Sequence, residues 1–232
     1  MKNIRIQPVT PADCARCPTH KVDLFSGLHE QDRVQLLRHF HLEQRAPRSV
    51  IYNEGERGES LYILRAGVVK HVRVSASGDE RIVRLSVTGN AIGLSLLAGG
   101  AYGTTAVTVT ATELCRIPMK IVETRMLEFP EFGLRVVRES QAQLREAEEF
   151  LTELSTGAAL ERVARLLLFL GDHAGEGHCL ILTREEMGAL LGITTETASR
   201  VIAEFRREGV VTERGDGTVS CDRGRLAALA AA

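Results

Sequence analysis

The chain has 232 residues, of which 44% are hydrophobic and 25% are charged, a balance that is ordinary for a globular protein of one large or two modest domains. The formal net charge is −1, so overall charge does not indicate a nucleic-acid partner. No run of eighteen apolar residues predicts a membrane helix, and the N-terminus lacks the apolar core of a signal peptide. These features favour a cytoplasmic protein.

Residues 1–45 predict an irregular arm followed by a short helix, in which Leu28, Val34, Leu37 and Phe40 recur at roughly helical spacing. The five cysteines of the chain are Cys14, Cys17, Cys115, Cys179 and Cys221. An odd and scattered set in a reducing compartment argues against a disulfide framework and leaves metal or redox chemistry open.

Residues 46–118 are rich in Val, Ile, Tyr and Thr, in short runs that are broken by Gly, Asn and Asp. The runs favour strands, and the breaks supply turn geometry at low cost. In residues 68–74, VVKHVRV, apolar and polar side chains alternate, which predicts one buried face and one wet face. Several short strands with turns at this spacing predict an antiparallel barrel or sandwich.

Residues 119–157 predict two helices, because residues 119–129 fit a short helix and Pro130 restarts the chain at a helix N-terminus. The second helix runs about six turns to Gly157, which we expect to be a hinge. Its heptad spacing of apolar residues favours a dimer interface, and a core helix of a single domain is the alternative. The predicted interface residues are Val137, Leu144, Leu151 and Leu154, with Leu134 on the same stripe.

Residues 158–232 begin with an amphipathic helix and a small ribbon and then carry the pattern of a helix-turn-helix. Thr183 and Glu186 form a predicted capping box, and Gly192 suits the tight turn that follows. Thr194 or Thr195 caps the second helix. The segment VVTERGDGTVSCD then predicts a β-hairpin, which would form a wing.

The polar side of the second helix carries Thr195, Glu196, Ser199 and Arg200 near its N-terminus, the part of a recognition helix that enters the major groove. Glutamate accepts from cytosine N4–H, arginine donates twice to guanine, and serine bonds a base or a phosphate. Arg214 of the predicted wing suits a phosphate contact. A helical hairpin with exposed charges is the alternative, but the turn, caps and wing together favour DNA reading.

Over nearly its whole length the chain resembles the Crp/Fnr family of transcription regulators. The segments GESLYILRAGVVKHVRVSASGDERIVRL and LCRIP are similar to the effector domain of that family, and MGALLGITTETASRVIAEFRREGVV is similar to its winged helix-turn-helix. The helix over residues 131–156 stands where the family has its dimer helix.

The resemblance implies an α+β fold. It comprises a cyclic-nucleotide-binding-like β-barrel of the double-stranded β-helix (jelly roll) type, a long dimerisation helix and a C-terminal winged helix-turn-helix. It also implies a homodimer that binds double-stranded DNA and, if it is an activator, RNA polymerase. The expected divisions are 1–45 for the arm, 46–118 for the barrel, 119–157 for the dimerisation region and 158–232 for the DNA-binding domain.

Within the family, the run ETASR is similar to the Fnr branch. This similarity implies that Glu196, Ser199 and Arg200 read bases in a palindromic operator of the form TTGAT-N4-ATCAA. Members that bind cyclic AMP hold its phosphate with a Gly-Glu pair and a following Arg. The corresponding segment here, residues 89–108, has no acidic residue and no arginine, so cyclic AMP is not expected as effector.

Cys14, Cys17 and Cys115 fall where Fnr proteins place three of the four ligands of a 4Fe–4S cluster. The remaining family cysteine would fall near Leu24–Phe25 and is absent. The resemblance therefore leaves the fourth ligand open, with Asp23 as the first candidate and His20 as the second.

Other signals remain alternatives, since Cys115 by itself also suits a buried apolar position. Haem-based nitric oxide or redox sensing has the candidate ligands His20, His29, His39, His41 and His71. A thiol switch, or no effector, is a further alternative. The sequence contains no catalytic triad, Walker loop or paired-carboxylate motif, so we expect no enzyme. A nucleotide-binding module without DNA regulation is disfavoured by the missing phosphate-binding arginine.

Overall fold

The computed structural model describes residues 4–17, 24–25, 36–173, 180, 182–213 and 219–231. The chain divides into two compact units. We call them the β-unit, which is Met1–Gly78 with Val83–Leu144, and the helical unit, which is Asp79–Ile82 with Arg145–Ala232. Each unit is described by itself.

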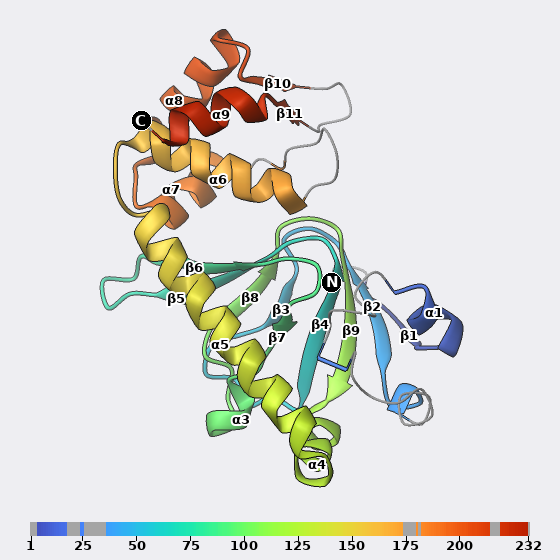
Figure 1. Cartoon of the computed structure of the whole chain (residues 1–232). Coiled ribbons are helices and arrows are strands. Elements are labelled where there is room, and N and C mark those ends of the chain that lie inside the picture. The colour runs from blue at the N-terminus through green and yellow to red at the C-terminus, as the bar shows by residue number, and fades with distance from the viewer. Residues whose placement is uncertain are drawn as a thin grey trace. The chain divides into compact units, whose positions relative to one another are not determined.

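The β-unit contains two sheets that enclose one apolar core (Figure 1). The first sheet has the order β1 (Arg5–Pro8), β2 (His41–Arg45), β9 (Thr112–Pro118), β4 (Ser60–Ala66) and β7 (Ala91–Ile92). The second has the order β3 (Val50–Tyr52), β8 (Thr105–Thr108), β5 (Val69–Val74) and β6 (Glu80–Ser86). Leu61, Leu114 and Ala106 are fully buried between them. The α+β fold is confirmed, although the described strands form two sheets and no closed barrel.

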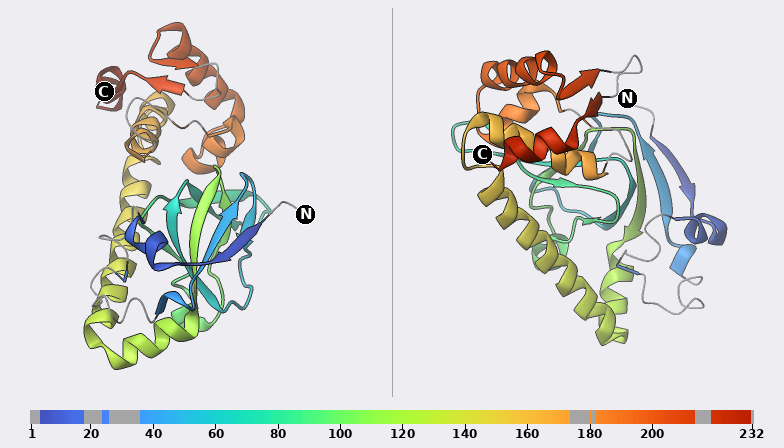
Figure 2. Two further views of the ribbon diagram at one scale, coloured as in Figure 1. Left: turned by 90° about the vertical axis from the view of Figure 1, so that its right-hand side faces the viewer. Right: turned by 45° about the horizontal axis from the view of Figure 1, so that its top comes forward.

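The N-terminal region contains more regular structure than the sequence indicates. Strand β1 pairs with β2, and β2 pairs with β9, so both join the first sheet, with α1 (Pro11–Ala15) beside them (Figure 2). Strand β2 was not predicted, because two of its buried side chains are charged and therefore do not give the apolar pattern of a strand. Glu43 is buried and accepts a hydrogen bond from Arg45 Nη2 at 2.7 Å. Most of the short helix expected after residue 27 lies outside the described residues.

Helices α3 (Leu96–Gly99) and α4 (Met119–Glu128) and the part of α5 (Pro130–Glu153) up to Leu144 complete the β-unit, and the rest of α5 belongs to the helical unit. The first half of α5 packs on the sheets through Phe132, whose ring lies 5.1 Å from that of Phe25. Farther along α5, the buried Gln143 donates to the carbonyl of Ala91 at 2.6 Å. An aromatic contact and a polar contact therefore fix this part of α5.

The helical unit contains α6 (Ala159–His173), α7 (Arg184–Leu191), α8 (Thr195–Arg207), β10 (Val211–Glu213), β11 (Val219–Cys221) and α9 (Arg223–Ala230). Leu166, Met187 and Phe205 are fully buried in its core. Helix α9 was not predicted, because Leu226 is its one buried residue and no apolar stripe marks it. The ribbon expected before α7 lies mostly outside the described residues. None of the described helices is both long and apolar enough to cross a membrane.

The contact between Phe132 and Phe25 predicts a large stability effect. Phe132→Ala should lower the free energy of unfolding of the β-unit by about 3–5 kcal/mol, because a fully packed ring is replaced by a cavity. Urea unfolding followed by circular dichroism measures this change. The matched control is Leu127→Ala on α4, where the side chain is 86% exposed and the cost should stay within about 0.5 kcal/mol. Equal losses in the two variants would contradict the predicted packing role.

Candidate nucleic-acid interface and sensory site

Helices α7 and α8 are joined by a tight turn that the local sequence builds. The Thr183 hydroxyl accepts from the Glu186 amide at 3.1 Å, and the Glu186 carboxylate accepts from the Thr183 amide at 3.0 Å, which is the predicted capping box. Gly192 ends α7 with φ at +66°. A Cβ on Gly188 would lie only 2.8 Å from the carbonyl oxygen of Ile193, so only glycine permits this approach of the turn to α7.

Helix α8 presents one polar face and one buried face. Thr194 caps it by accepting from the Thr197 amide at 3.2 Å. The buried side chains are Ala198, Val201, Ile202 and Phe205. The exposed residues near its N-terminus are Thr195, Glu196, Ser199 and Arg200, the four that the sequence predicts for DNA contact. The structure therefore brings these four residues to the solvent-facing side of the first turns of α8.

The carboxylate of Glu196 is held in its ionised form. Hydrogen bonds from its own backbone amide and from the Thr194 hydroxyl lower the pKa of Glu196 below its ordinary value. An ionised carboxylate is an acceptor only, as the exocyclic amine of cytosine requires.

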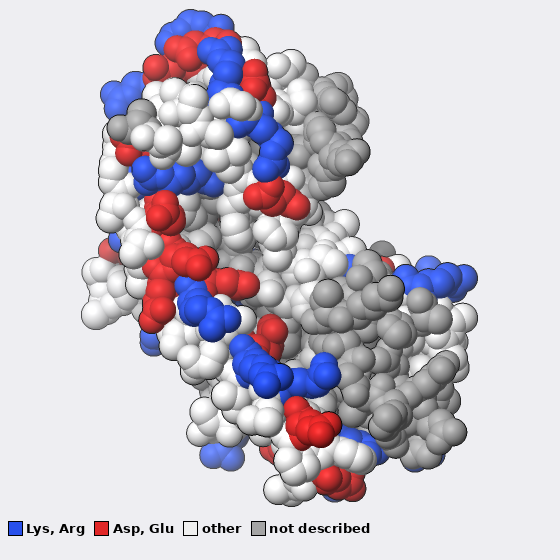
Figure 3. Space-filling model, in the orientation of Figure 1, with Lys and Arg blue, Asp and Glu red and all other residues white. Residues whose placement is uncertain are grey.

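Strands β10 and β11 form the predicted hairpin, with Val211 opposite Cys221. Arg214 and the tip of this hairpin lie outside the described residues. On the face drawn in Figure 3, basic and acidic side chains are interspersed, which agrees with the net charge of −1.

Three of the predicted metal ligands meet at one pocket of the β-unit. Cys14 lies in α1, Cys17 follows it, and Cys115 lies in β9, yet all three line the same pocket. The sheet explains this meeting, because β1, which leads into α1, pairs with β2, and β2 pairs with β9, where Cys115 lies opposite Leu42. The other lining residues are Val9, Phe25, Leu37, Phe40, Ile63, Arg65 and Ile117.

Arg65 gives this apolar pocket a buried cation. Its side chain is only 9% exposed, its Nη2 donates to the carbonyl of Asp13 at 3.2 Å, and its Nη1 lies 3.4 Å from a Glu113 carboxylate oxygen. Its Nε is buried and has no hydrogen-bond partner among the described residues. A buried donor without a hydrogen-bond partner costs free energy, and an acceptor or anion bound in the pocket would offset that cost.

The pocket suits a soft, anionic metal cluster in its chemistry, because thiolates bind iron–sulfur clusters and a guanidinium offsets negative charge. The three cysteines line the same pocket, but they do not lie close enough together to form a metal-binding group. Among the described residues, no three His, Cys, Asp or Glu side chains are gathered closely enough to hold a metal ion. Both candidates for the fourth ligand, Asp23 and His20, lie outside the described residues.

The structure excludes His71 as a haem ligand. His71 is fully buried, and its ring nitrogens lie 3.1 Å from Thr104 Oγ1 and 2.9 Å from Ser86 Oγ. Burial lowers the pKa of His71 well below its ordinary value, so the ring is neutral at physiological pH. With both nitrogens engaged, His71 is a core residue and no metal ligand. His20 and His29 lie outside the described residues, whereas His39 Nε2 accepts from Arg38 at 3.2 Å.

Sequence reasoning missed Arg84 of β6. One guanidinium nitrogen of Arg84 lies 3.3 Å from His71 Nε2, and the other bonds the Gln143 side chain of α5. A cation therefore lies close to Thr104, although residues 89–108 contain none. The alternation of β6 was the available signal, because Arg84 shares a face with the buried Ile82 and Ser86.

The predicted dimer seam of α5 is apolar and exposed over most of its length. Val137, Leu144 and Leu151 recur at heptad spacing and are 53%, 50% and 67% exposed, and Leu134 is also exposed. Leu154 differs from the predicted interface, because only 4% of it is exposed. It lies beyond the end of α5 at Glu153 and is buried within its own chain.

Comparison with known proteins finds two family models. Residues 42–128 match a cyclic nucleotide-binding domain, and residues 161–229 match a Crp-like helix-turn-helix domain. The chain is 26% identical over 209 residues to the regulatory protein HlyX of Actinobacillus pleuropneumoniae, covering 87% of each chain. It is 25% identical over 211 residues to the fumarate and nitrate reduction regulatory protein of Salmonella typhi, covering 87% of this chain and 83% of that one.

Among solved structures, FixK2 from Bradyrhizobium japonicum superposes with a TM-score of 0.73 at 25% identity. The match covers 82% of this chain and 97% of FixK2.

Proposed function

Because the chain belongs to the Crp/Fnr family of DNA-binding transcription regulators, we propose that it reads a palindromic TTGAT-N4-ATCAA-like operator as a dimer and responds to a redox or gas signal. The observation that carries this proposal is the exposed set Thr195, Glu196, Ser199 and Arg200 on α8. The relatives are named as regulators, and the chain has no catalytic role in the proposal.

DNA reading uses three side chains of α8 in distinct ways. The ionised Glu196 accepts from cytosine N4, Arg200 donates two hydrogen bonds to guanine, and Ser199 bonds a neighbouring base or phosphate. Thr195 and Arg214 contact the phosphate backbone and set the register. The two copies of α8 in a dimer fit half-sites about one helical turn apart, as a palindrome requires.

Dimerisation uses the exposed heptad face of α5. Val137, Leu144 and Leu151 would pack against the same residues of a second copy, since an exposed apolar stripe of this length favours an isologous helix pair. The resulting protein works in the cytoplasm and, where it activates, contacts RNA polymerase.

The signal enters at the cysteine pocket. Cys14, Cys17 and Cys115 would hold a 4Fe–4S cluster, with Asp23 as the fourth ligand and His20 as its alternative. When bound, the cluster supplies oxygen- and redox-sensitive chemistry. Arg65 would offset its negative charge, and the partnerless Nε would donate to a sulfur. Phe25 lines the pocket and contacts Phe132 of α5, so a change at the cysteines can reach the dimer helix.

Arg200→Ala tests base reading. The variant should lose about 1–3 kcal/mol of binding free energy on the cognate operator and discriminate less at one guanine, because a bidentate contact is lost. Fluorescence anisotropy with cognate and single-base-changed duplexes measures both effects. The control is Arg207→Ala at the other end of α8, which should affect all duplexes alike. If Arg200→Ala also weakens random and cognate DNA equally, Arg200 is only a phosphate contact.

Leu151→Glu tests the dimer seam. A glutamate would bury a charge against its copy in the partner helix, so the protein should sediment as a monomer. Analytical ultracentrifugation measures the outcome, with Leu127→Glu on the exposed face of α4 as control. A stable dimer of the Leu151→Glu variant would place the interface elsewhere.

Cys17→Ala tests the cluster. Anaerobically purified wild type should be brown and contain iron and acid-labile sulfide, whereas Cys17→Ala should lose both because one ligand is gone. The control is Cys221→Ala in β11, which should keep the colour. Colourless wild-type protein that still binds a TTGAT-type operator would exclude the cluster, and a Soret band would assign the signal to haem.

A further inference from the structure

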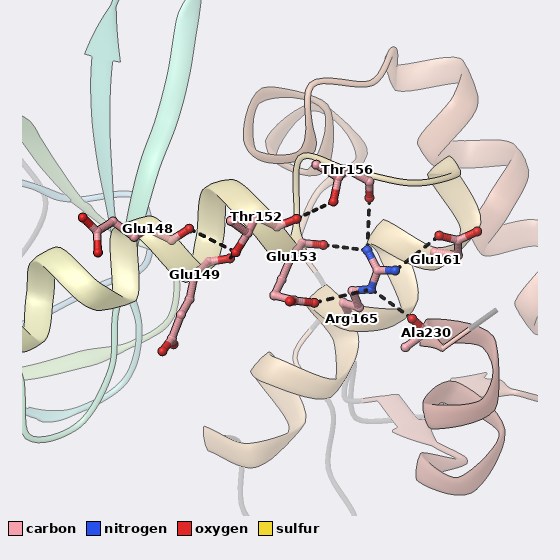
Figure 4. Close-up of polar contacts among 8 residues, drawn as sticks. All are labelled: Glu148, Glu149, Thr152, Glu153, Thr156, Glu161, Arg165 and Ala230. Atoms are coloured by element: carbon pink, nitrogen blue, oxygen red, sulfur yellow. Dashed lines mark hydrogen bonds and ion pairs between the residues drawn. The ribbon is translucent and has the colours of Figure 1, made fainter.

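Arg165 of α6 bonds the C-terminal ends of two other helices (Figure 4). Its Nη1 donates to the carbonyl of Glu153 at 2.8 Å and to that of Thr156 at 3.0 Å, at the end of α5. Its Nε donates to the carbonyl of Ala230, at the end of α9, at 3.0 Å. Its Nη2 donates to the Glu161 carboxylate at 3.2 Å, which braces the guanidinium from its own helix.

These contacts suit an arginine for a general reason. The last carbonyls of a helix have no intrahelical partner and form the negative end of the helix dipole. The guanidinium carries five donors in a fixed planar fork, so one side chain satisfies several carbonyls at once. The Arg165 side chain is 21% exposed, which screens these bonds from water in part. A lysine would keep the charge but not the fork.

Gly157 lies at the same junction, where the sequence predicts a hinge. Its φ is +86°, and a Cβ would lie 2.2 Å from the Glu161 carboxylate and 3.5 Å from Arg165 Nη1. Glycine is favoured here because this φ lies in the left-handed region, whereas the Glu161 and Arg165 side-chain ends could move aside for a Cβ. The segment between α5 and α6 is therefore an exposed corner, of which Leu154 is buried and which Arg165 bonds through main-chain carbonyls.

Side-chain bonds continue from this corner in both directions. The Thr152 hydroxyl donates to the carbonyl of Glu149 at 3.0 Å, and the Thr156 hydroxyl donates to the carbonyl of Thr152. These side-chain bonds connect successive turns at the end of α5. On the other side, Arg162 Nη1 donates to the carbonyl of Leu191 at 2.8 Å, at the end of α7. Helix α6 thus bonds the end of the dimerisation helix through one arginine and the helix-turn-helix through another.

We propose that Arg165 is a positioning residue that fixes the helix-turn-helix on the last turn of α5. The inference rests on the proposed dimeric DNA reading, but not on the nature of the signal. Two recognition helices can meet two half-sites at low entropic cost only if each is held at a set angle to the dimer helix. Arg165 touches no base or phosphate in this role and acts through the corner that it holds.

The experiment compares Arg165→Ala, Arg165→Lys and the control Arg223→Ala. Arg223 bonds Asp172 in the same unit, where both side chains are more than half exposed, so its loss should have little effect. Hydrogen exchange measures the amides of residues 151–154 at the end of α5, and fluorescence anisotropy measures affinity for a duplex that the wild type selects from a random pool. Sedimentation and thermal unfolding report the dimer and the fold.

Arg165→Ala should exchange the amides of residues 151–154 at least about tenfold faster and bind the selected duplex about tenfold more weakly, while it remains a folded dimer. Arg165→Lys should recover part of both effects, and Arg223→Ala should match the wild type. Should Arg165→Ala fail to fold, the exchange and affinity of Arg165→Lys decide.

Unchanged exchange, or an affinity within about twofold of wild type, would overturn the proposal. A loss of affinity that merely follows the unfolded fraction would also overturn it, because Arg165 would then be only a stability residue. Wild-type protein that selects no duplex contradicts the proposed function, whereas exchange still shows whether Arg165 holds the corner.

Discussion

The position of strand β9 is the constraint on which the rest of the β-unit depends. It pairs with β2 on one side and β4 on the other, so Cys115 lies opposite both Leu42 and Ile63. That register brings a cysteine from the central strand of the sheet into the same pocket as Cys14 and Cys17. The chain leaves β9 directly into α4 and then α5. One strand therefore joins the candidate sensory pocket to the helix that carries the apolar seam.

Buried charges in this unit are arranged in two different ways. Arg45 gives two donors to the buried Glu43 and a third to the carbonyl of Val50, so its desolvation cost is offset by short bonds. Arg65 is equally buried, but its Nε has no partner among the described residues. Proteins rarely leave a buried donor unsatisfied without a reason. The unsatisfied Nε is the feature on which the proposed role of Arg65 at the cluster site rests.

Hydrogen bonds at the ends of helices are a recurring feature of the helical unit. Its caps at Thr183 and Thr194 satisfy amides at the starts of α7 and α8, and arginines of α6 satisfy carbonyls at the ends of its neighbours. The caps act within the first turn of their own helices, whereas the two arginines bond α6 to the ends of α7 and α9. The exposed residues of α8 are thus part of a unit in which polar contacts at helix ends add to the apolar core.

The sequence by itself determined the elements whose signals are local. The capping box at Thr183, the turn at Gly192 and the heptad spacing of α5 are patterns within a few helical turns, where neighbouring residues decide the conformation. The four exposed residues of α8 followed from the same periodicity. Only the tertiary structure decided what depends on distant pairing: that β2 joins the sheet despite Glu43, that Arg84 reaches α5, and that Leu154 is buried. It also decided that Gly157 lies in a corner held by Arg165, because carbonyls from two other helices meet that side chain only after the chain has folded.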